Sequence, residues 1–132
     1  MDALCLIVAG ALAATLPGEA FTLAWTHSVQ KTGWEERYRI DGERLRLVGA
    51  RVEGSGAGME VPPEAKRDRT GWTWSPQATL PSLTLAGSTF GGDYLLCAGG
   101  ACRPLADLVG HRSGPVELRA CRAGGAPRDP PG

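Results

Sequence analysis

The residues that could carry out chemistry are concentrated in two short stretches of the chain. The first runs from Trp25 to Glu36 and holds a histidine, a serine, a lysine and two threonines. The second, residues 54–58, is rich in glycine and contains one serine. Such groups could bind an anion, because backbone N–H groups of successive glycines converge on it while cationic side chains add charge. The predicted ligand-binding residues are His27, Ser28, Lys31, Thr32, Glu36, Arg51, Ser55, Gly56 and Gly58.

A β-hairpin is predicted to position the first stretch. Apolar and polar residues alternate in residues 21–27 and again in residues 34–40, which is the pattern of half-buried strands. We expect Trp25 to lie opposite Glu36 in this hairpin, because the two apolar faces then coincide. His27 and Glu36 therefore fall on the face that otherwise forms the core.

A third strand is predicted to follow the second through the dipeptide Asp41-Gly42, which is typical of a two-residue type I′ turn. This turn sets Tyr38 opposite Leu45 and places Arg51 on the same face as His27. In an antiparallel meander, the loop between the first two strands and the segment that leaves the third lie at one end of the sheet. The two reactive stretches are thus expected to be neighbours.

The same residues allow two other interpretations. A small serine hydrolase would use Ser55 or Ser28 as the nucleophile, His27 as the base and Glu36 to orient the base. The G-x-S-x-G motif of many hydrolases does not accompany them. In a purely structural interpretation, Glu36 pairs with His27 or Arg51 and satisfies a polar group near the core.

The four cysteines could form two disulfides. Cys97 and Cys102 flank Gly99-Gly100, so a hairpin there sets the two cysteines directly opposite each other, with a Cα separation of about 4.5 Å. Cys5 with Cys121 could form the second bridge, and the alternative is four small buried thiols. A second pair of ligands at zinc-site spacing is lacking. We therefore expect neither a metal nor a cofactor.

Length and composition favour one all-β domain. The chain has 132 residues, 19 of them glycine and 10 proline, and few uninterrupted helical windows. We predict an antiparallel β-sandwich or partly open barrel of about eight short strands over residues 1–121. Residues 122–132 hold glycine, proline and charge, and are predicted to be a disordered tail. Fourteen basic and fourteen acidic residues cancel, which argues against nucleic acid as a partner.

The first 20 residues can be interpreted in two ways, and the choice decides the expected location. Residues 4–16 are apolar and small, as in a signal peptide, although the basic residues that normally precede such a segment are missing. Alternatively, residues 4–8 and 11–16 are paired strands around an Ala9-Gly10 turn. The first interpretation places the protein in the periplasm or at a membrane, and the second is compatible with the cytoplasm.

The two reactive stretches resemble a bacterial family known as domain of unknown function 1850. The resemblance rests on the run from Phe21 to Thr32, on Trp34-Glu35-Glu36 and on residues 54–60, and it covers about Phe21 to Cys102. Gln30 stands where the family usually carries an acidic residue. Family members are often encoded beside TAXI-type TRAP transporters, which import organic acids.

The resemblance implies a non-enzymatic accessory or binding module in such uptake. Its expected partners are the permease or its solute-binding protein, and its expected ligand is a small carboxylate or another anion. A structural protein that docks on a permease, through a strand edge or through Trp72 and Trp74, is a further alternative.

Overall fold

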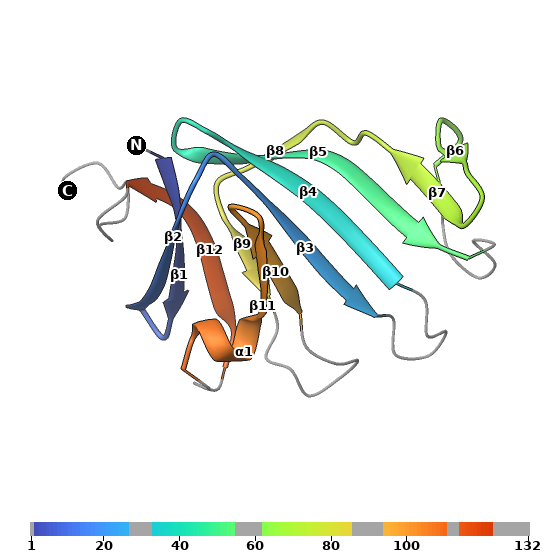
Figure 1. The fold of residues 1–132 in the computed structure, drawn as a ribbon. Coiled ribbons are helices and arrows are strands. Elements are labelled where there is room, and N and C mark those ends of the chain that lie inside the picture. The colour runs from blue at the N-terminus through green and yellow to red at the C-terminus, as the bar shows by residue number, and fades with distance from the viewer. Residues whose placement is uncertain (1, 27–32, 55–61, 86–93, 111–113, 123–132) are drawn as a thin grey trace.

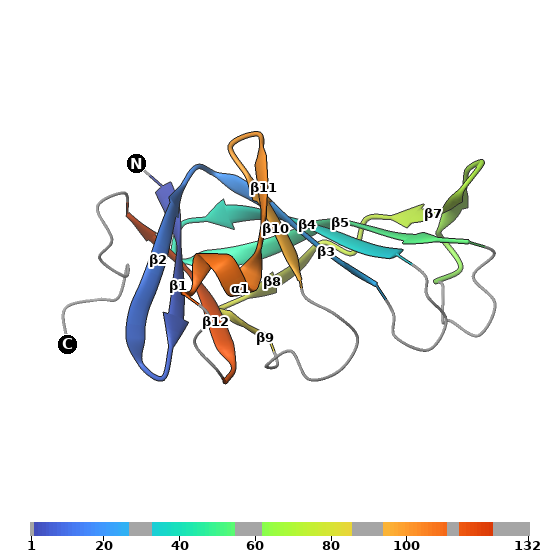
Figure 2. The ribbon, with the colours of Figure 1, turned by 60° about the horizontal axis from the view of Figure 1, so that its bottom comes forward.

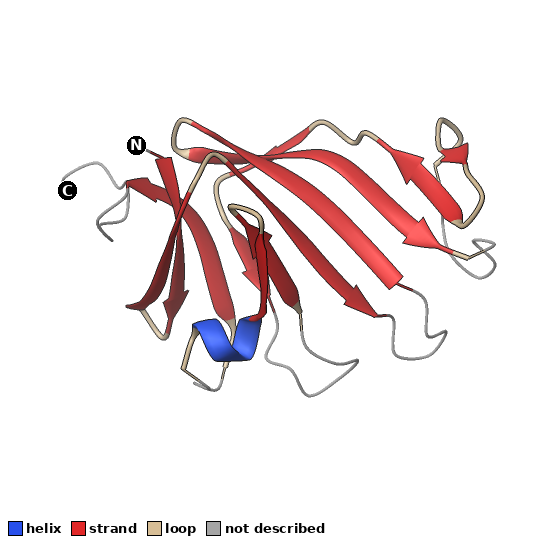
Figure 3. Cartoon of the chain, viewed as in Figure 1, coloured by secondary structure: helices blue, strands red, loops and turns tan. Residues whose placement is uncertain are grey.

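A computed structural model describes residues 2–26, 33–54, 62–85, 94–110 and 114–122. Strands dominate it, as Figure 3 shows, and one short helix is present in these ranges. The elements are β1 (Asp2–Val8), β2 (Ala11–Pro17), β3 (Ala20–Thr26), β4 (Gly33–Asp41), β5 (Arg44–Glu53), β6 (Lys66–Arg67), β7 (Gly71–Trp74), β8 (Ala78–Leu80), β9 (Leu83–Leu85), β10 (Leu95–Ala98), β11 (Ala101–Pro104), α1 (Leu105–Leu108) and β12 (Val116–Arg122).

The strands form two antiparallel sheets. The smaller sheet has the order β2-β1-β12-β9, and the larger has the order β11-β10-β3-β4-β5-β7-β6, with β8 also paired to β5. Figure 1 shows the smaller sheet against one part of the larger, whose β6–β7 end extends beyond it. The predicted all-β fold is confirmed, and the sheets do not close into a barrel. The described residues form twelve strands rather than about eight, because several connections contain strands of two to four residues.

The hydrophobic core lies between the two sheets. One side of it comes from alternate residues of β1 and β12, and the other from alternate residues of β3, β4 and β5. α1 closes the core on the same side as the smaller sheet, as seen in Figure 2. The buried apolar residues of this cluster are Leu4, Leu6, Val8, Phe21, Leu23, Tyr38, Ile40, Leu45, Leu85, Leu96, Leu105, Val109, Val116, Leu118 and Ala120.

β1 and β2 form an antiparallel hairpin around Ala9 and Gly10, both of which have positive φ. β1 is hydrogen-bonded to β2 on one side and to β12 on the other. Cys5 forms a disulfide with Cys121 of β12, with a Cα separation of 5.8 Å. In the structure, residues 4–16 therefore form the paired strands of the second interpretation.

The hairpin of β3 and β4 exists, but the predicted register is wrong by two residues. Trp25 lies opposite Trp34 rather than Glu36, and Phe21 lies opposite Tyr38. A shift of two residues keeps every side chain on its face, so the hydrophobic pattern could not detect it. The observed register stacks the aromatic pairs, with ring centroids 6.1 Å apart for Trp25–Trp34 and 5.0 Å apart for Phe21–Tyr38.

The turn between β4 and β5 also differs from the prediction. Gly42 and Glu43 are its central residues, and Gly42 alone of the two has positive φ, as in a type II′ turn. Asp41 then lies opposite Arg44. This pairing of opposite charges, together with apolar pairs farther along the strands, favours the observed turn over the predicted type I′ turn.

A β-bulge in β5 overturns the predicted face of Arg51. Tyr38 lies opposite Leu47 and Arg37 lies opposite Gly49, so Val48 is the extra residue. One extra residue reverses the alternation of side chains beyond it. Arg51 consequently lies on the outer face of the larger sheet rather than on the core face.

The second disulfide lies in the hairpin of β10 and β11, where it was predicted. Cys97 lies opposite Cys102, with a Cα separation of 4.0 Å, and Gly99 and Gly100 both have positive φ. All four cysteines are thus in disulfides. At the end of the chain, β12 includes Arg122, which the sequence assigned to the tail, and residues 123–132 lie outside the described ranges.

Candidate functional site

The described ranges contain two of the predicted ligand-binding residues, Glu36 and Arg51. Glu36 belongs to β4 and Arg51 to β5. The bulge places their side chains on opposite faces of the larger sheet, so the expected pairing of Glu36 with Arg51 is wrong. The alternative pairing of Glu36 with His27 lies outside the described residues. The other predicted ligand-binding residues lie outside the described ranges, and they are His27, Ser28, Lys31, Thr32, Ser55, Gly56 and Gly58.

The strand ends that adjoin the two reactive stretches are neighbours. Thr26, the last residue of β3, lies opposite Gly33, the first residue of β4. Val52, near the end of β5, lies opposite Trp34. Antiparallel pairing therefore brings these three strand ends to one end of the larger sheet, as the meander predicts and as Figure 1 shows.

Glu36 lies on the core face and is hydrogen-bonded. The hydroxyl of Tyr38 donates to Glu36 Oε1 at 2.7 Å. Burial of the Tyr38 side chain raises its pKa well above the usual value, and the hydrogen bond to Glu36 raises it further. Tyr38 therefore stays protonated and continues to donate at any pH the protein normally meets.

Aromatic side chains form a row across the core face beside Glu36. Trp25 lies 5.6 Å from Tyr94 and 6.1 Å from Trp34, and Trp34 lies 6.3 Å from Trp74 in an edge-to-face arrangement, all measured between ring centroids. The indole Nε1 of Trp34 is buried and has no hydrogen-bond partner in the described part of the chain. Trp25 and Tyr94 pack against the hydrophobic core, so the row continues the core toward the end of the sheet.

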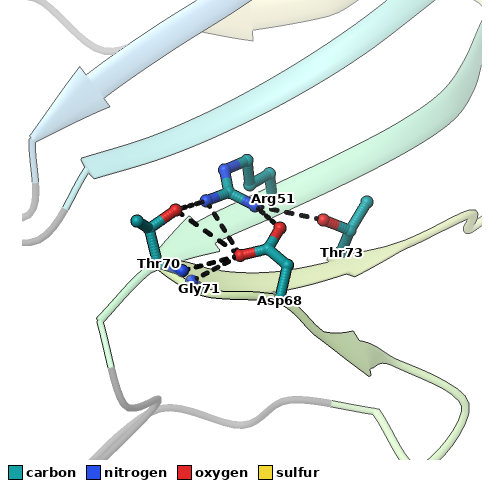
Figure 4. Close-up of polar contacts among 5 residues, drawn as sticks. All are labelled: Arg51, Asp68, Thr70, Gly71 and Thr73. Atoms are coloured by element: carbon teal, nitrogen blue, oxygen red, sulfur yellow. Dashed lines mark hydrogen bonds and ion pairs between the residues drawn. The ribbon is translucent and has the colours of Figure 1, made fainter.

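Arg51 is held on the outer face by the segment that leads into β7, as Figure 4 shows. Its Nη1 and Nη2 both donate to the carboxylate of Asp68, Nη2 also donates to Thr70, and Nη1 lies 3.3 Å from Thr73 Oγ1. The same carboxylate accepts the backbone N–H groups of Thr70 at 2.9 Å and Gly71 at 2.8 Å. Arg51 is therefore half of an organised ion pair.

The ion pair changes the titration of both partners. The hydrogen bond from Arg51 and the backbone N–H groups lower the pKa of Asp68 to about 2. The hydrogen bond with Asp68 raises the pKa of Arg51. Sequence reasoning missed Asp68, although the run Asp68-Arg69-Thr70-Gly71 is typical of a turn in which an aspartate binds backbone N–H groups.

A pocket of about 340 Å³ lies beside this ion pair, at the end of the larger sheet where the strands adjoining the reactive stretches end. Its lining includes Thr26 and Gly33, which flank residues 27–32. The full lining consists of Ala24, Trp25, Thr26, Gly33, Trp34, Glu35, Arg51, Glu53 and Leu95.

A protein-family model described as a domain of unknown function, DUF1850, matches residues 21–105. The chain belongs to the DUF1850 family. The matched region begins in β3 and ends in α1, so it contains the larger sheet apart from Ala20 and the whole lining of the pocket. Comparisons with curated proteins and with solved structures found no match.

The described lining gives the DUF1850 pocket a mixed charge. Arg51 is balanced by Asp68, and the carboxylates of Glu35 and Glu53 also act on it electrostatically. Thr26 and Glu53 are exposed at the rim, while Leu95 adds an apolar surface. These side chains can hold a small polar molecule by hydrogen bonds and ionic contacts.

Two further properties concern the described residues as a whole. They contain no group of three histidine, cysteine, aspartate or glutamate side chains arranged to hold a metal ion. The one helix in the described ranges, α1, has four residues, and no helix there has the length and apolar character needed to span a membrane.

Proposed function

We propose that this DUF1850 protein is a non-enzymatic binding module, accessory to organic-acid uptake by a TAXI-type TRAP transporter. The observation that carries the proposal is the pocket at the end of the larger sheet. Its walls come from β3, β4 and β5, the strands that adjoin both reactive stretches of the sequence. A pocket with an arginine, two glutamates, a threonine and an apolar side chain suits a small polar ligand rather than a macromolecule.

The proposed ligand is a small carboxylate. Arg51 supplies a guanidinium whose two terminal nitrogens already meet Asp68, so a ligand carboxylate needs additional positive charge. The segment that joins Thr26 to Gly33 contains the cationic residue Lys31 and the protonatable residue His27. Thr26 and Gly33 themselves line the pocket. We propose that His27 and Lys31 provide that charge.

The remaining predicted residues are proposed as hydrogen-bond donors to the ligand. Ser28 and Thr32 would donate hydroxyl hydrogen bonds to the carboxylate oxygens. The backbone N–H groups of residues 55–58 would contribute further donors, as glycine-rich segments do for other anions. The permease or solute-binding protein of the transporter is the proposed partner.

Calorimetric titration of the full chain with a panel of mono- and dicarboxylates tests this proposal. We expect Lys31→Ala to weaken binding about 10-fold or more, since it removes a charge-assisted hydrogen bond of about 1.5–3 kcal/mol. We expect Arg51→Ala also to weaken binding, since it removes the positive charge that offsets Glu35 and Glu53 beside the ligand. Arg122→Ala is the matched control, because Arg122 is an exposed arginine on the smaller sheet.

Two outcomes would contradict the proposal. The first is that all three variants bind carboxylates as the unaltered protein does, while circular dichroism shows each of them folded. The second is covalent labelling of Ser28 or Ser55 by a fluorophosphonate probe, which would indicate the hydrolase alternative instead.

A further inference from the structure

Three arginines occupy neighbouring positions on the outer face of the larger sheet. Arg37 and Arg39 alternate with the buried residues of β4, and Arg46 lies between two inward-facing leucines of β5. The smaller sheet and α1 pack against the opposite face, as Figures 1 and 2 show. The three guanidinium groups therefore share a face that the described elements leave open.

The arrangement of these arginines is electrostatically unfavourable by itself. Arg39 lies directly opposite Arg46 in the ladder, and like charges in directly opposite positions repel each other. Arg39 forms an ion pair with Glu19, whose carboxylate lies 3.9 Å from Arg39 Nη2. Their side chains are 53% and 73% exposed, so this ion pair contributes little.

Two details show that the cluster is partly fixed in place. The Nε of Arg46 is buried and has no hydrogen-bond partner among the described residues. The guanidinium of Arg37 lies flat over Gly49, where a Cβ would clash with its Nη2, Nε and Cζ atoms. The burial of Arg46 Nε and the packing of Arg37 on Gly49 limit the movement of these two side chains, so their terminal nitrogens are held at the surface.

The arginines on either side of the cluster each lie opposite an acidic residue in the strand ladder. Arg44 lies opposite Asp41. Arg51 is paired with Asp68 and lies opposite Glu35. Within the described ranges, the exposed contact of Arg39 with Glu19 is the one ion pair at the three central arginines, so positive charge predominates at the centre of this face.

The side chains that flank the cluster are small. Ala20 lies opposite Arg39 on β3, Thr22 lies opposite Arg37, and Thr79 lies opposite Arg46 on β8. Gly49, which has no side chain, accommodates the guanidinium of Arg37. Thr22 and Thr79 also carry hydroxyl groups that can donate to an oxygen atom.

We propose that Arg37, Arg39 and Arg46 form a binding site for a multivalent oxyanion, such as a phosphate or a tricarboxylate. The planar guanidinium fork donates two parallel hydrogen bonds to such oxyanions. An anion placed between Arg39 and Arg46 replaces their repulsion with attraction to both. This site is separate from the pocket of the proposed function, and neither depends on the other.

Thermal unfolding of the full chain in inorganic phosphate, citrate and chloride, at constant ionic strength, tests the site. We expect phosphate and citrate to raise the midpoint and chloride to have no such effect. Arg46→Gln should weaken phosphate binding about 10-fold or more. In the absence of phosphate and at low salt, the same variant should unfold at a higher temperature than the unaltered protein, since the repulsion from Arg39 is gone.

Arg44→Gln is the matched control, because Arg44 lies on the same strand and face but opposite an aspartate. It should keep the phosphate response. Glu19→Gln should strengthen phosphate binding, as it removes the carboxylate beside Arg39.

Equal stabilisation of Arg44→Gln and Arg46→Gln by phosphate would overturn the site, and so would a loss of stability in Arg46→Gln at low salt. Binding to vesicles of anionic lipid without any response to free phosphate or citrate would assign the arginines to a membrane surface instead.

Discussion

Removal of residues 2–19 should abolish the cooperative fold. The deletion takes away β1, which is hydrogen-bonded on both sides, and with it Leu4, Leu6 and Val8, which are 2%, 0% and 5% exposed. Burial of each such side chain stabilises the fold by about 1.5–3 kcal/mol, so the three together contribute about 5–9 kcal/mol. A domain of this size has a net stability of only about 5–15 kcal/mol. The shortened chain therefore retains little or no stability.

Urea unfolding followed by tryptophan fluorescence and far-ultraviolet circular dichroism measures this effect. Leu6→Ala is a milder variant of the same test and should cost about 2–5 kcal/mol. Leu12→Ala on β2 is its control, because Leu12 is 41% exposed and should change stability far less. A cooperative transition of the shortened chain at the unaltered urea midpoint would refute the reasoning, and the DUF1850 region from Phe21 onward would then fold alone.

Three other predictions follow from contacts elsewhere in the molecule. Replacing Cys5 and Cys121 with alanine should lower the free energy of unfolding by about 4–5 kcal/mol in urea titrations, because the disulfide closes a loop of 116 residues, and an unchanged midpoint would contradict this. The Asp68 pKa of about 2 lies below its ordinary 3.8, so the ion pair with Arg51 adds stability above about pH 4 that is lost as the pH falls toward 2. The stability difference between the unaltered protein and Asp68→Asn should shrink over that range, and a constant difference would disprove the linkage. Tyr38→Phe removes a hydrogen bond to a carboxylate and should destabilise the protein by about 1–3 kcal/mol in the same urea assay, whereas a neutral effect would show that the bond is not formed in solution.

The sequence predicted the strands well where side chains alternate. The alternation in residues 21–26 and 34–40 places Phe21, Leu23 and Tyr38 in the core as expected. The Gly99-Gly100 turn also placed the second disulfide correctly, since two residues with positive φ determine the register of a short hairpin.

The register and the bulge could not be predicted because they depend on contacts between strands. A two-residue shift preserves the faces, and the stacking of Trp25 on Trp34 selects the observed register. Gly49 in the interior of the strand is a weak sign of a bulge, but it does not determine which residue is the extra one, and in the structure that residue is Val48. That single residue moved Arg51 to the other face and separated it from Glu36.

The sequence correctly predicted which strand ends meet at one end of the larger sheet. It placed Glu36 and Arg51 on one face, whereas the structure places them on opposite faces. Strand topology fixes which ends meet, so β3, β4 and β5 converge as expected. The partner of Arg51 comes from the segment before β7, which no pattern in the strands connects to β5. This contact depends on the path of the segment before β7, and the alternation of side chains along the strands carries no information about that path.

Chemical-shift mapping of a carboxylate titration tests the central claim most directly. The amide resonances of ¹⁵N-labelled full-length protein are followed as a dicarboxylate such as succinate is added. The account predicts saturable shifts concentrated at the residues that line the pocket, including Thr26, Gly33, Glu53 and Leu95. Shifts that are absent, or that are confined to the smaller sheet, would contradict a binding site at this end of the larger sheet.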